Sequence, residues 1–311
     1  MKTRKFSLAL AIFLLVSAAF VSSCRKKSTE EKDTDTSAAT DNNLAESTSN
    51  DVVNMAGQAS ENSNVAYRGG NDEGPLSSFC VSYWKRDTIR FVDSVAFSGG
   101  VCADGRSRSG SITFTYGAKQ NTMHYRTPGF TCTVKTYNYV VDGNHITLTK
   151  TITNNSPNSG GIPTGNLTWN VTANATIVKA GNGGTITWSC NRNHTLLNTS
   201  AAYTIGGASV PACYNGANLP ITWSNAVLSF SGTASGTTAK GGSYSLTGTN
   251  LILNMTCSDV NHPNRHPFVE GTIDFTPSGK ATRHVDFGNG TCDMQFTVTI
   301  NGTTYGPYTM P

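Results

Sequence analysis

Two acidic residues of the C-terminal part, Glu270 and Asp274, carry the carboxyl groups that cleavage of a glycosidic bond requires. Such cleavage uses one carboxyl group as a general acid and a second as a base or nucleophile. A separation of four residues places both side chains on one face of an expected strand. Asp104, Asp142 and Asp293 fall at expected turns, where aspartate serves backbone geometry. A glycan- or peptidoglycan-directed hydrolase, with Glu270 and Asp274 as catalytic candidates, is therefore one interpretation of the chain.

Two further groups have residue types that bind metal ions. His262 and His266 lie in a stretch whose two prolines prevent both rings from projecting from successive turns of a helix. Asp286, Asn289 and Asp293 loosely resemble a calcium loop, but EF-hand spacing and its closing glutamate are absent. A solvated loop and a hairpin turn account for these residues, so we predict neither a metal site nor a cofactor.

Tryptophan side chains offer a binding alternative to catalysis, because an exposed indole ring can stack on a sugar ring. Trp169 and Trp188 alternate with apolar neighbours and are expected in the core. Trp84 lies beside Lys85 and Arg86, so it is the one tryptophan that we expect to be exposed and available for binding.

From Phe79 onward, polar and apolar residues alternate with period two, as in Ser111–Tyr116, His145–Thr153, Asn166–Thr172 and Gln295–Ile300. Threonine at the outward positions favours strand, and one polar face is typical of an antiparallel sheet packed on one side. The spacing of the runs predicts about twelve to fourteen strands. We therefore expect an all-β fold, a large antiparallel sandwich or a partly closed barrel. Hairpin turns are predicted at four dipeptides, Asp142-Gly143, Asn182-Gly183, Asn289-Gly290 and Asn301-Gly302.

Cysteines near both ends of this β-rich part stand in similar surroundings. Cys80 and Cys102 bracket a Val-Asp strand and a Gly-rich turn, and Cys257 and Cys292 bracket a second such segment. We predict two disulfides, Cys80–Cys102 and Cys257–Cys292. Loops of this length contribute about 3–4 kcal/mol each in the chain-entropy treatment.

Three other cysteines remain in this part of the chain. Cys190 and Cys213 form a third candidate pair, which leaves Cys132 as a free thiol within a strand. The cysteines have no CxxC motif and no zinc-finger spacing, so structural disulfides are preferred to metal ligation.

The N-terminus has the features of an export signal. Lys2, Arg4 and Lys5 precede an apolar run of about 15 residues that ends at Val21-Ser22-Ser23-Cys24. This ending resembles the lipobox of bacterial lipoproteins, which implies a diacylglycerol on the Cys24 thiol after removal of residues 1–23. The implied partner is the lipid bilayer, because two or three acyl chains make attachment effectively permanent.

Charge is divided unevenly along the chain. Residues 25–73 hold five Lys/Arg and ten Asp/Glu, whereas residues 74–311 hold fifteen Lys/Arg and nine Asp/Glu. The acidic segment is disfavoured near an anionic membrane and would hold the body away from it. The basic excess of the body is scattered over the sequence, which is typical of a solvated surface, and we expect no nucleic-acid partner.

The chain divides into four parts: a signal peptide at 1–23, a lipidated tether at 24–40, a short helix and loop at 41–75, and an antiparallel β-domain at 76–311. The tether is polar and contains no aromatic residue, which is typical of a disordered segment. The helix is expected from about Asp41 to Ser60, where apolar residues recur on one face.

Three stretches are similar to a known group of proteins: Leu44–Ala56, Cys102–Ile112 and the ending Val285–Asp293 with Ile300-Asn301-Gly302, of which the Asp-Phe-Gly-x-Gly-Thr-Cys-Asp motif at 286–293 is the most specific. They resemble β-rich lipoproteins of Bacteroidota-type Gram-negative bacteria. The resemblance implies a β fold and an outer-membrane address, but no activity. Surface-exported lipoproteins of such bacteria often have acidic residues directly after the lipidated cysteine, whereas Arg25-Lys26-Lys27 follow here. Both the periplasmic and the cell-surface side therefore stay open.

The preferred hypothesis is an outer-membrane-anchored β-domain that binds a glycan or other envelope proteins, or acts as a scaffold, without catalysis. Motifs for a nucleophile elbow, a phosphate-binding loop, a dinucleotide fold or a zinc protease are absent from the sequence. The alternatives are the hydrolase with Glu270 and Asp274, and an accessory subunit of an outer-membrane complex.

Overall fold

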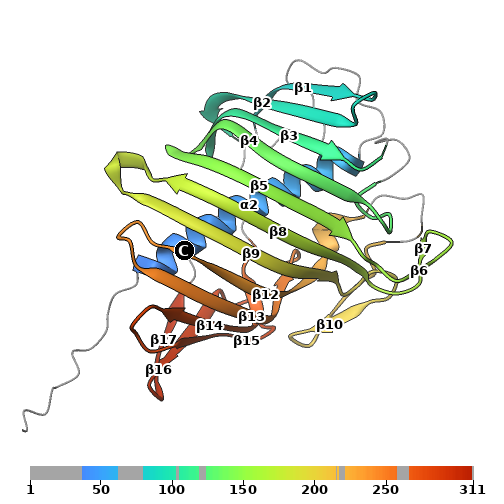
Figure 1. Ribbon diagram of the computed structural model, residues 1–311. Helices are drawn as coiled ribbons and strands as arrows, with labels where there is room; N and C mark the ends of the chain where they lie inside the picture. Colours follow the sequence, from blue (N-terminus) through green and yellow to red (C-terminus); the bar gives the residue numbers. More distant parts are fainter. Residues whose placement is uncertain are drawn as a thin grey trace, which may run out of the picture. The chain divides into compact units, whose positions relative to one another are not determined.

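Thirteen strands pair side by side into one antiparallel sheet (Figure 1), and in strands such as β5 (Asn144–Asn154) apolar residues alternate with hydroxyl-bearing ones. The computed structural model describes residues 37–61, 80–102, 105–118, 124–214, 216, 221–257 and 266–309. Cys24, most of the expected tether, Asp104 and His262 lie outside the described residues.

The strands follow one another in space in the order of the chain, so the sheet is a meander. Its strands are β1 (Val81–Asp87), β2 (Val92–Val101), β3 (Ser107–Tyr116), β4 (Thr131–Val141), β5 (Asn144–Asn154), β8 (Leu167–Val178), β9 (Thr185–Leu196), β12 (Val227–Thr237), β13 (Ser243–Asn254), β14 (Phe268–Pro277), β15 (Arg283–Asn289), β16 (Gln295–Ile300) and β17 (Thr303–Thr309). The all-β prediction is confirmed. The thirteen long strands form a single antiparallel sheet. This sheet does not close, and β1 and β17 are its two edge strands.

Short elements are inserted between the long strands. They are the hairpins β6 (Asn158–Ser159) with β7 (Ile162–Pro163) and β10 (Tyr203–Ile205) with β11 (Ala208–Val210), and the 3-10 turns η2 (Ala180–Asn182) and η3 (Trp223–Asn225). β10 and β11 carry Ile205 and Val210, which pack with Val227, Ile252 and Val269 in a small apolar cluster apart from the main core.

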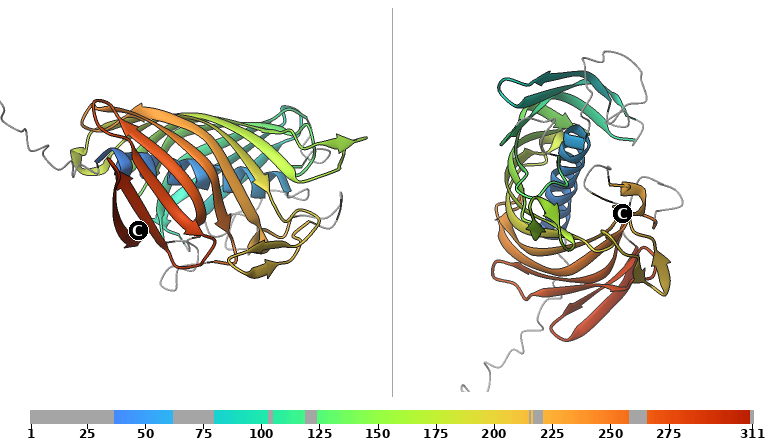
Figure 2. Two further views of the ribbon diagram at one scale, coloured as in Figure 1. Left: turned by 90° about the horizontal axis from the view of Figure 1, so that it is seen from below. Right: turned by 90° about the vertical axis from the view of Figure 1, so that its right-hand side faces the viewer.

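The sheet curves around one side of the helix α2 (Ser37–Glu61), as Figure 2 shows. We call the side of the sheet that bears α2 the concave face and the other side the convex face. In β5 the concave positions Ile146, Leu148 and Ile152 are buried, whereas the threonines between them are exposed. Period-two alternation therefore places the main core between the sheet and α2.

The helix α2 begins four residues before the predicted start at Asp41 and has 25 residues. Its buried side chains are small or of moderate size, including Ala45, Val52, Met55 and Ala56. This composition lets the helix lie close to the sheet. Among the described residues, no helix has the length and apolar character that crossing a membrane requires.

Two of the four predicted hairpin turns are confirmed. Asp142 and Gly143 have φ of 51° and 77°, and Asn301 and Gly302 have φ of 50° and 77°, as a type I′ turn requires. At Asn182-Gly183 the glycine has φ of −69°, and Asn289 belongs to β15, so these two predictions of a two-residue turn are wrong.

The two main disulfide predictions are confirmed, because Cys80 is bonded to Cys102 and Cys257 to Cys292. The third pair is wrong. Within the described ranges, Cys132, Cys190 and Cys213 are all free thiols. Cys190 lies on β9, whereas the Cys213 thiol is turned to Asn198 and donates to its side-chain oxygen at 3.3 Å.

Candidate functional site

Charged groups, rather than apolar contacts alone, hold α2 on the concave face. The helix carries Asp41, Glu46 and Asp51 at intervals of five residues. Each of them meets a cation of the sheet or its turns. Five residues correspond to about 7.5 Å along a helix, so the three acids are spread over its length.

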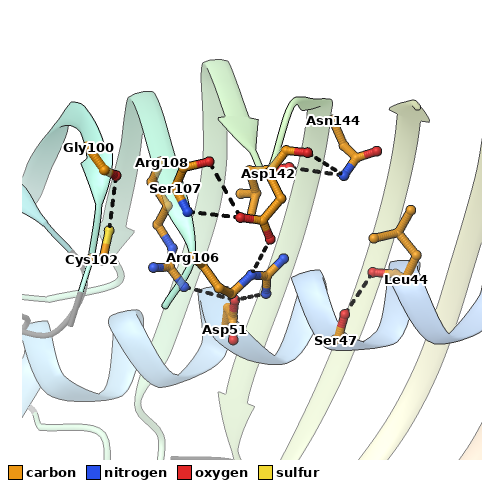
Figure 3. A network of polar contacts seen from close by, with 11 residues as sticks. Leu44, Ser47, Asp51, Gly100, Cys102, Arg106, Ser107, Arg108, Asp142 and Asn144 are labelled. Atoms are coloured by element: carbon orange, nitrogen blue, oxygen red, sulfur yellow. Dashed lines mark hydrogen bonds and ion pairs between the residues drawn. The ribbon is translucent and has the colours of Figure 1, made fainter. Parts of the chain in front are cut away.

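Asp51 lies between two arginines at the start of β3, as Figure 3 shows. Its carboxylate accepts hydrogen bonds from Arg106 and, at 3.1 Å, from Arg108. Arg106 also donates to Asp142 at 2.9 Å, in the turn between β4 and β5. The Arg108 side chain has no exposed surface, so the negative charge of Asp51 offsets the cost of burying it.

The N-terminal half of α2 is fixed in the same way. Arg192 of β9 donates to Glu46, and Lys179 donates to Asp41 at 2.7 Å. The second carboxylate oxygen of Asp41 accepts a hydrogen bond from the backbone N–H of Ala239, in the turn after β12. These contacts join segments that are about 140–200 residues apart in the chain.

A lysine is buried beneath the middle of α2. Lys150 of β5 is 2% exposed and donates to the carbonyl oxygen of Ser49 at 2.7 Å. Burial lowers the pKa of Lys150 to about 8, while the charges of Glu46 and Asp51 act in the opposite direction. The helix α2 covers the Lys150 amine and supplies a backbone carbonyl oxygen that accepts its hydrogen bond. Lys150 therefore helps to fix the helix on the sheet. The middle of the concave face is thus filled by the chain itself.

The convex face is polar, uncharged over a wide area and open. Three serines of adjacent strands, Ser189, Ser235 and Ser245, lie directly opposite one another in register and form what we call the serine row. Two rows flank the serine row, Asn191–Thr233–Thr247 and Thr187–Thr237–Ser243, and all their side chains except Ser243 are larger than serine. Small side chains between larger ones leave a shallow depression that runs across the strands.

This depression, the convex groove, extends over β8, β9, β12 and β13. It consists of two adjoining spaces of about 370 and 560 Å³ that share Asn174, Ser189 and Ser235 among their lining residues. The lining side chains of the convex face are hydroxyl or amide groups and include no charged residue.

Hydrogen bonds between neighbouring side chains hold the walls of the groove in place. The hydroxyl oxygens of Thr187 and Thr237 are 2.7 Å apart, and those of Ser189 and Ser235 are 3.2 Å apart. Asn170 donates to the side-chain oxygen of Asn191 at 2.8 Å. Each hydroxyl keeps further donor or acceptor capacity, because it has one donor and two lone pairs. The groove therefore presents many neutral hydrogen-bonding groups in a fixed arrangement.

The candidate catalytic acids do not form a cleft. Glu270 and Asp274 both lie on the convex face of β14, and Asp274 pairs with the exposed His284 of β15 at 2.7 Å. Their positions on an outward-curving surface do not provide the opposed carboxyl groups that glycoside cleavage needs. The prediction that these residues form a catalytic pair is not supported by this geometry.

The prediction of an exposed Trp84 is wrong. Its side chain is 5% exposed and lies on the concave face, with the guanidinium of Arg86 5.7 Å from its ring. Arg86 itself pairs with the buried Asp93, so the basic neighbour that indicated exposure is part of the interior. Trp169 and Trp188 are buried as predicted.

Sequence reasoning missed both the buried cations and the convex groove. Lys150 is an even number of residues away from Ile146, Leu148 and Ile152, so strict alternation could have placed its side chain on the same, inner face. The serine row has no comparable signal, because it exists only once the register of three strands is known.

Comparisons of the chain with protein families, with curated proteins and with solved structures find no match.

Proposed function

We propose that this chain is a lipid-anchored, non-catalytic binding domain of the bacterial cell envelope, and that its ligand is a neutral glycan held in the convex groove. The observation that carries the proposal is the serine row between two rows of threonine, asparagine and serine side chains. A glycan is a chain of neutral rings bearing hydroxyl groups, which need both donors and acceptors from their site.

The absence of charge among the lining side chains supports a neutral ligand over an anionic one. A phosphate- or sulfate-bearing polymer is recognised through lysine and arginine, and its affinity falls steeply with salt. The groove has neither residue among those that line it.

The anchor in this proposal rests on the sequence. Cys24 follows a basic and apolar export signal, and only twelve residues separate it from Ser37, the first residue of α2. At about 3.4 Å per residue, this segment spans at most about 45 Å. This length sets the greatest distance of Ser37 from the lipid anchor, on the periplasmic or the outer side of the outer membrane.

Loss of the anchor is the simplest expected result for the Cys24→Ala variant. The wild-type chain should carry the mass of a diacylglycerol and stay with the membrane fraction, whereas the variant should lack that mass. A wild-type chain that is cleaved but has an unmodified cysteine would refute the anchor, and would leave the glycan proposal intact.

Binding to a glycan array tests the ligand class. The mature chain in mild detergent should bind neutral oligosaccharides in preference to sulfated or phosphorylated ones, and the affinity should change less than about twofold between 50 and 500 mM NaCl, since no ion pair forms. A signal restricted to anionic glycans, or one lost in high salt, would contradict the proposal.

A bulky side chain in the groove locates the site. Ser235→Arg, at an exposed position of the serine row, should weaken binding at least tenfold because the arginine fills the space between the flanking rows. The matched control is Thr115→Arg, at an exposed convex position of β3, well away from the groove. Equal binding by both variants would rule out the groove as the site.

A further inference from the structure

The rows of side chains that form the convex groove continue beyond it, toward the N-terminal edge of the sheet. Ser189 of the serine row lies opposite Asn174 of β8, which in turn lies opposite Thr149 of β5. One flanking row continues in the same way, as Thr187–Thr176–Thr147. β5, β8 and β9 pair without a register shift, so the rows stay parallel to one another as they cross these strands.

Tyr137 of β4 stands where these rows reach the next strand. Lys135 lies opposite Thr149, and the Tyr137 side chain, two residues further along β4, is exposed on the same convex face. Tyr137 is 50% exposed, the largest value for a tyrosine among the described residues. Its partner on β3 is the small Ser111. An aromatic ring is therefore presented to solvent at the end of the path that leads out of the groove.

In the other direction, a flanking row ends at a carboxylate. Thr247 lies opposite Asp274 of β14, which pairs with His284 at 2.7 Å. A neutral ligand that covered this pair would remove a carboxylate from water without offering a compensating charge. On the side of β5 and β8 the rows consist of threonine and asparagine side chains. A neutral chain is therefore favoured to leave the groove toward β4.

We propose that the ligand is a linear glycan that crosses the strands, and that the Tyr137 ring stacks on one of its sugar rings beyond the groove. This inference rests on the glycan binding proposed above and adds a subsite to it. From β8, where the groove ends, to β4 is two strand spacings, about 10 Å, which is on the order of two sugar rings. Lys135, beside Tyr137, has N–H groups that can donate to sugar hydroxyl groups.

Oligosaccharides of two lengths test this subsite. The probes are the trisaccharides and hexasaccharides of the cello- and chito-oligosaccharide series, which are linear and neutral. They are titrated by calorimetry into the mature chain, in a detergent that has no sugar head group. A trisaccharide fills only the groove, whereas a hexasaccharide also reaches Tyr137. The hexasaccharide should therefore bind about fivefold more tightly, because it gains the stacking contact.

Variants of Tyr137 assign this gain to the aromatic ring. Tyr137→Ala should remove the gain and leave trisaccharide binding within about twofold of the parent, which also shows that the variant is folded. Tyr137→Phe should keep the gain, because stacking needs the ring and not the hydroxyl group. The matched control is Tyr308→Ala, which removes a tyrosine that is 46% exposed on the opposite edge strand, β17, and should also keep the gain.

The outcomes separate the subsite from the groove. A parent chain that binds both lengths equally, or a gain that survives Tyr137→Ala, would overturn the Tyr137 subsite and leave the groove intact. Loss of the gain in Tyr137→Phe as well would overturn stacking as its cause. Absence of binding at both lengths would overturn the glycan proposal, and the subsite with it.

Discussion

Replacement of Asp93 by alanine is expected to lower the free energy of unfolding by about 3–5 kcal/mol, because it removes the carboxylate that pairs with the buried guanidinium of Arg86. The two side chains form a paired contact, with Nε 2.9 Å from one carboxylate oxygen and Nη2 2.7 Å from the other. They are 7% and 0% exposed. The Tyr116 hydroxyl donates to the same carboxylate at 3.1 Å, so that group also loses a partner.

Urea unfolding with a common slope measures this loss. The matched control is Asp274→Ala, which breaks the exposed pair with His284 on the convex face and should cost less than about 1 kcal/mol. The double replacement Arg86→Met with Asp93→Leu should recover most of the stability, since it removes both charges together. Equal effects of Asp93→Ala and Asp274→Ala would contradict the buried pair.

Acid should destabilise the protein through His194, and replacement of this residue should remove that part of the effect. His194 of β9 is 5% exposed and packs edge-on against Phe230 at 4.4 Å. Burial lowers the pKa of His194 from 6.5 to about 3, and the nearby charges of Lys150 and Arg192 act in the same direction. The ring is therefore neutral in the folded protein at pH 7.

The direction of the pH effect follows from proton binding. Between pH 6.5 and about 3, the unfolded chain protonates His194 and the folded chain does not. The unfolded state then binds more protons, so stability falls as the pH is lowered through this range, in total by on the order of 5 kcal/mol.

Unfolding at pH 7 and at pH 4 checks this prediction. The difference in stability between the two pH values should be smaller by on the order of 3 kcal/mol in His194→Gln than in the parent. His145→Gln, which changes an exposed histidine of β5, should leave the difference unaltered. An unchanged difference in His194→Gln would show that the ring is protonated, or solvent-accessible, in the folded chain.

Local pattern was sufficient to predict most of the fold. The alternation in His145–Thr153 identifies both the strand β5 and its buried face, because the side chains of a strand point in turn to opposite sides. The curvature of the sheet and its open edges could not be read in this way. They depend on twist, on bulges such as the one between Thr249 and Ile252, and on what covers the concave face.

Residues whose roles depend on distant partners were harder to predict. Trp84 was expected at the surface because Arg86 follows it closely, but Arg86 points inward to Asp93 of the next strand. Likewise, nothing near Lys150 in the sequence indicates that a helix about 100 residues earlier supplies its acceptor. A charged side chain that points into the core needs a hydrogen-bonding or oppositely charged partner from another element of the fold, and only the tertiary structure identifies that partner.

A crystal structure of the mature chain with the best-binding oligosaccharide of the array tests the central claim most directly. We expect sugar rings on the convex face over Ser189, Ser235 and Ser245, with hydrogen bonds to the hydroxyl and amide groups of the flanking rows. Sugar bound on the concave face, at the sheet edges or beside Glu270 and Asp274, with the serine row free, would contradict it.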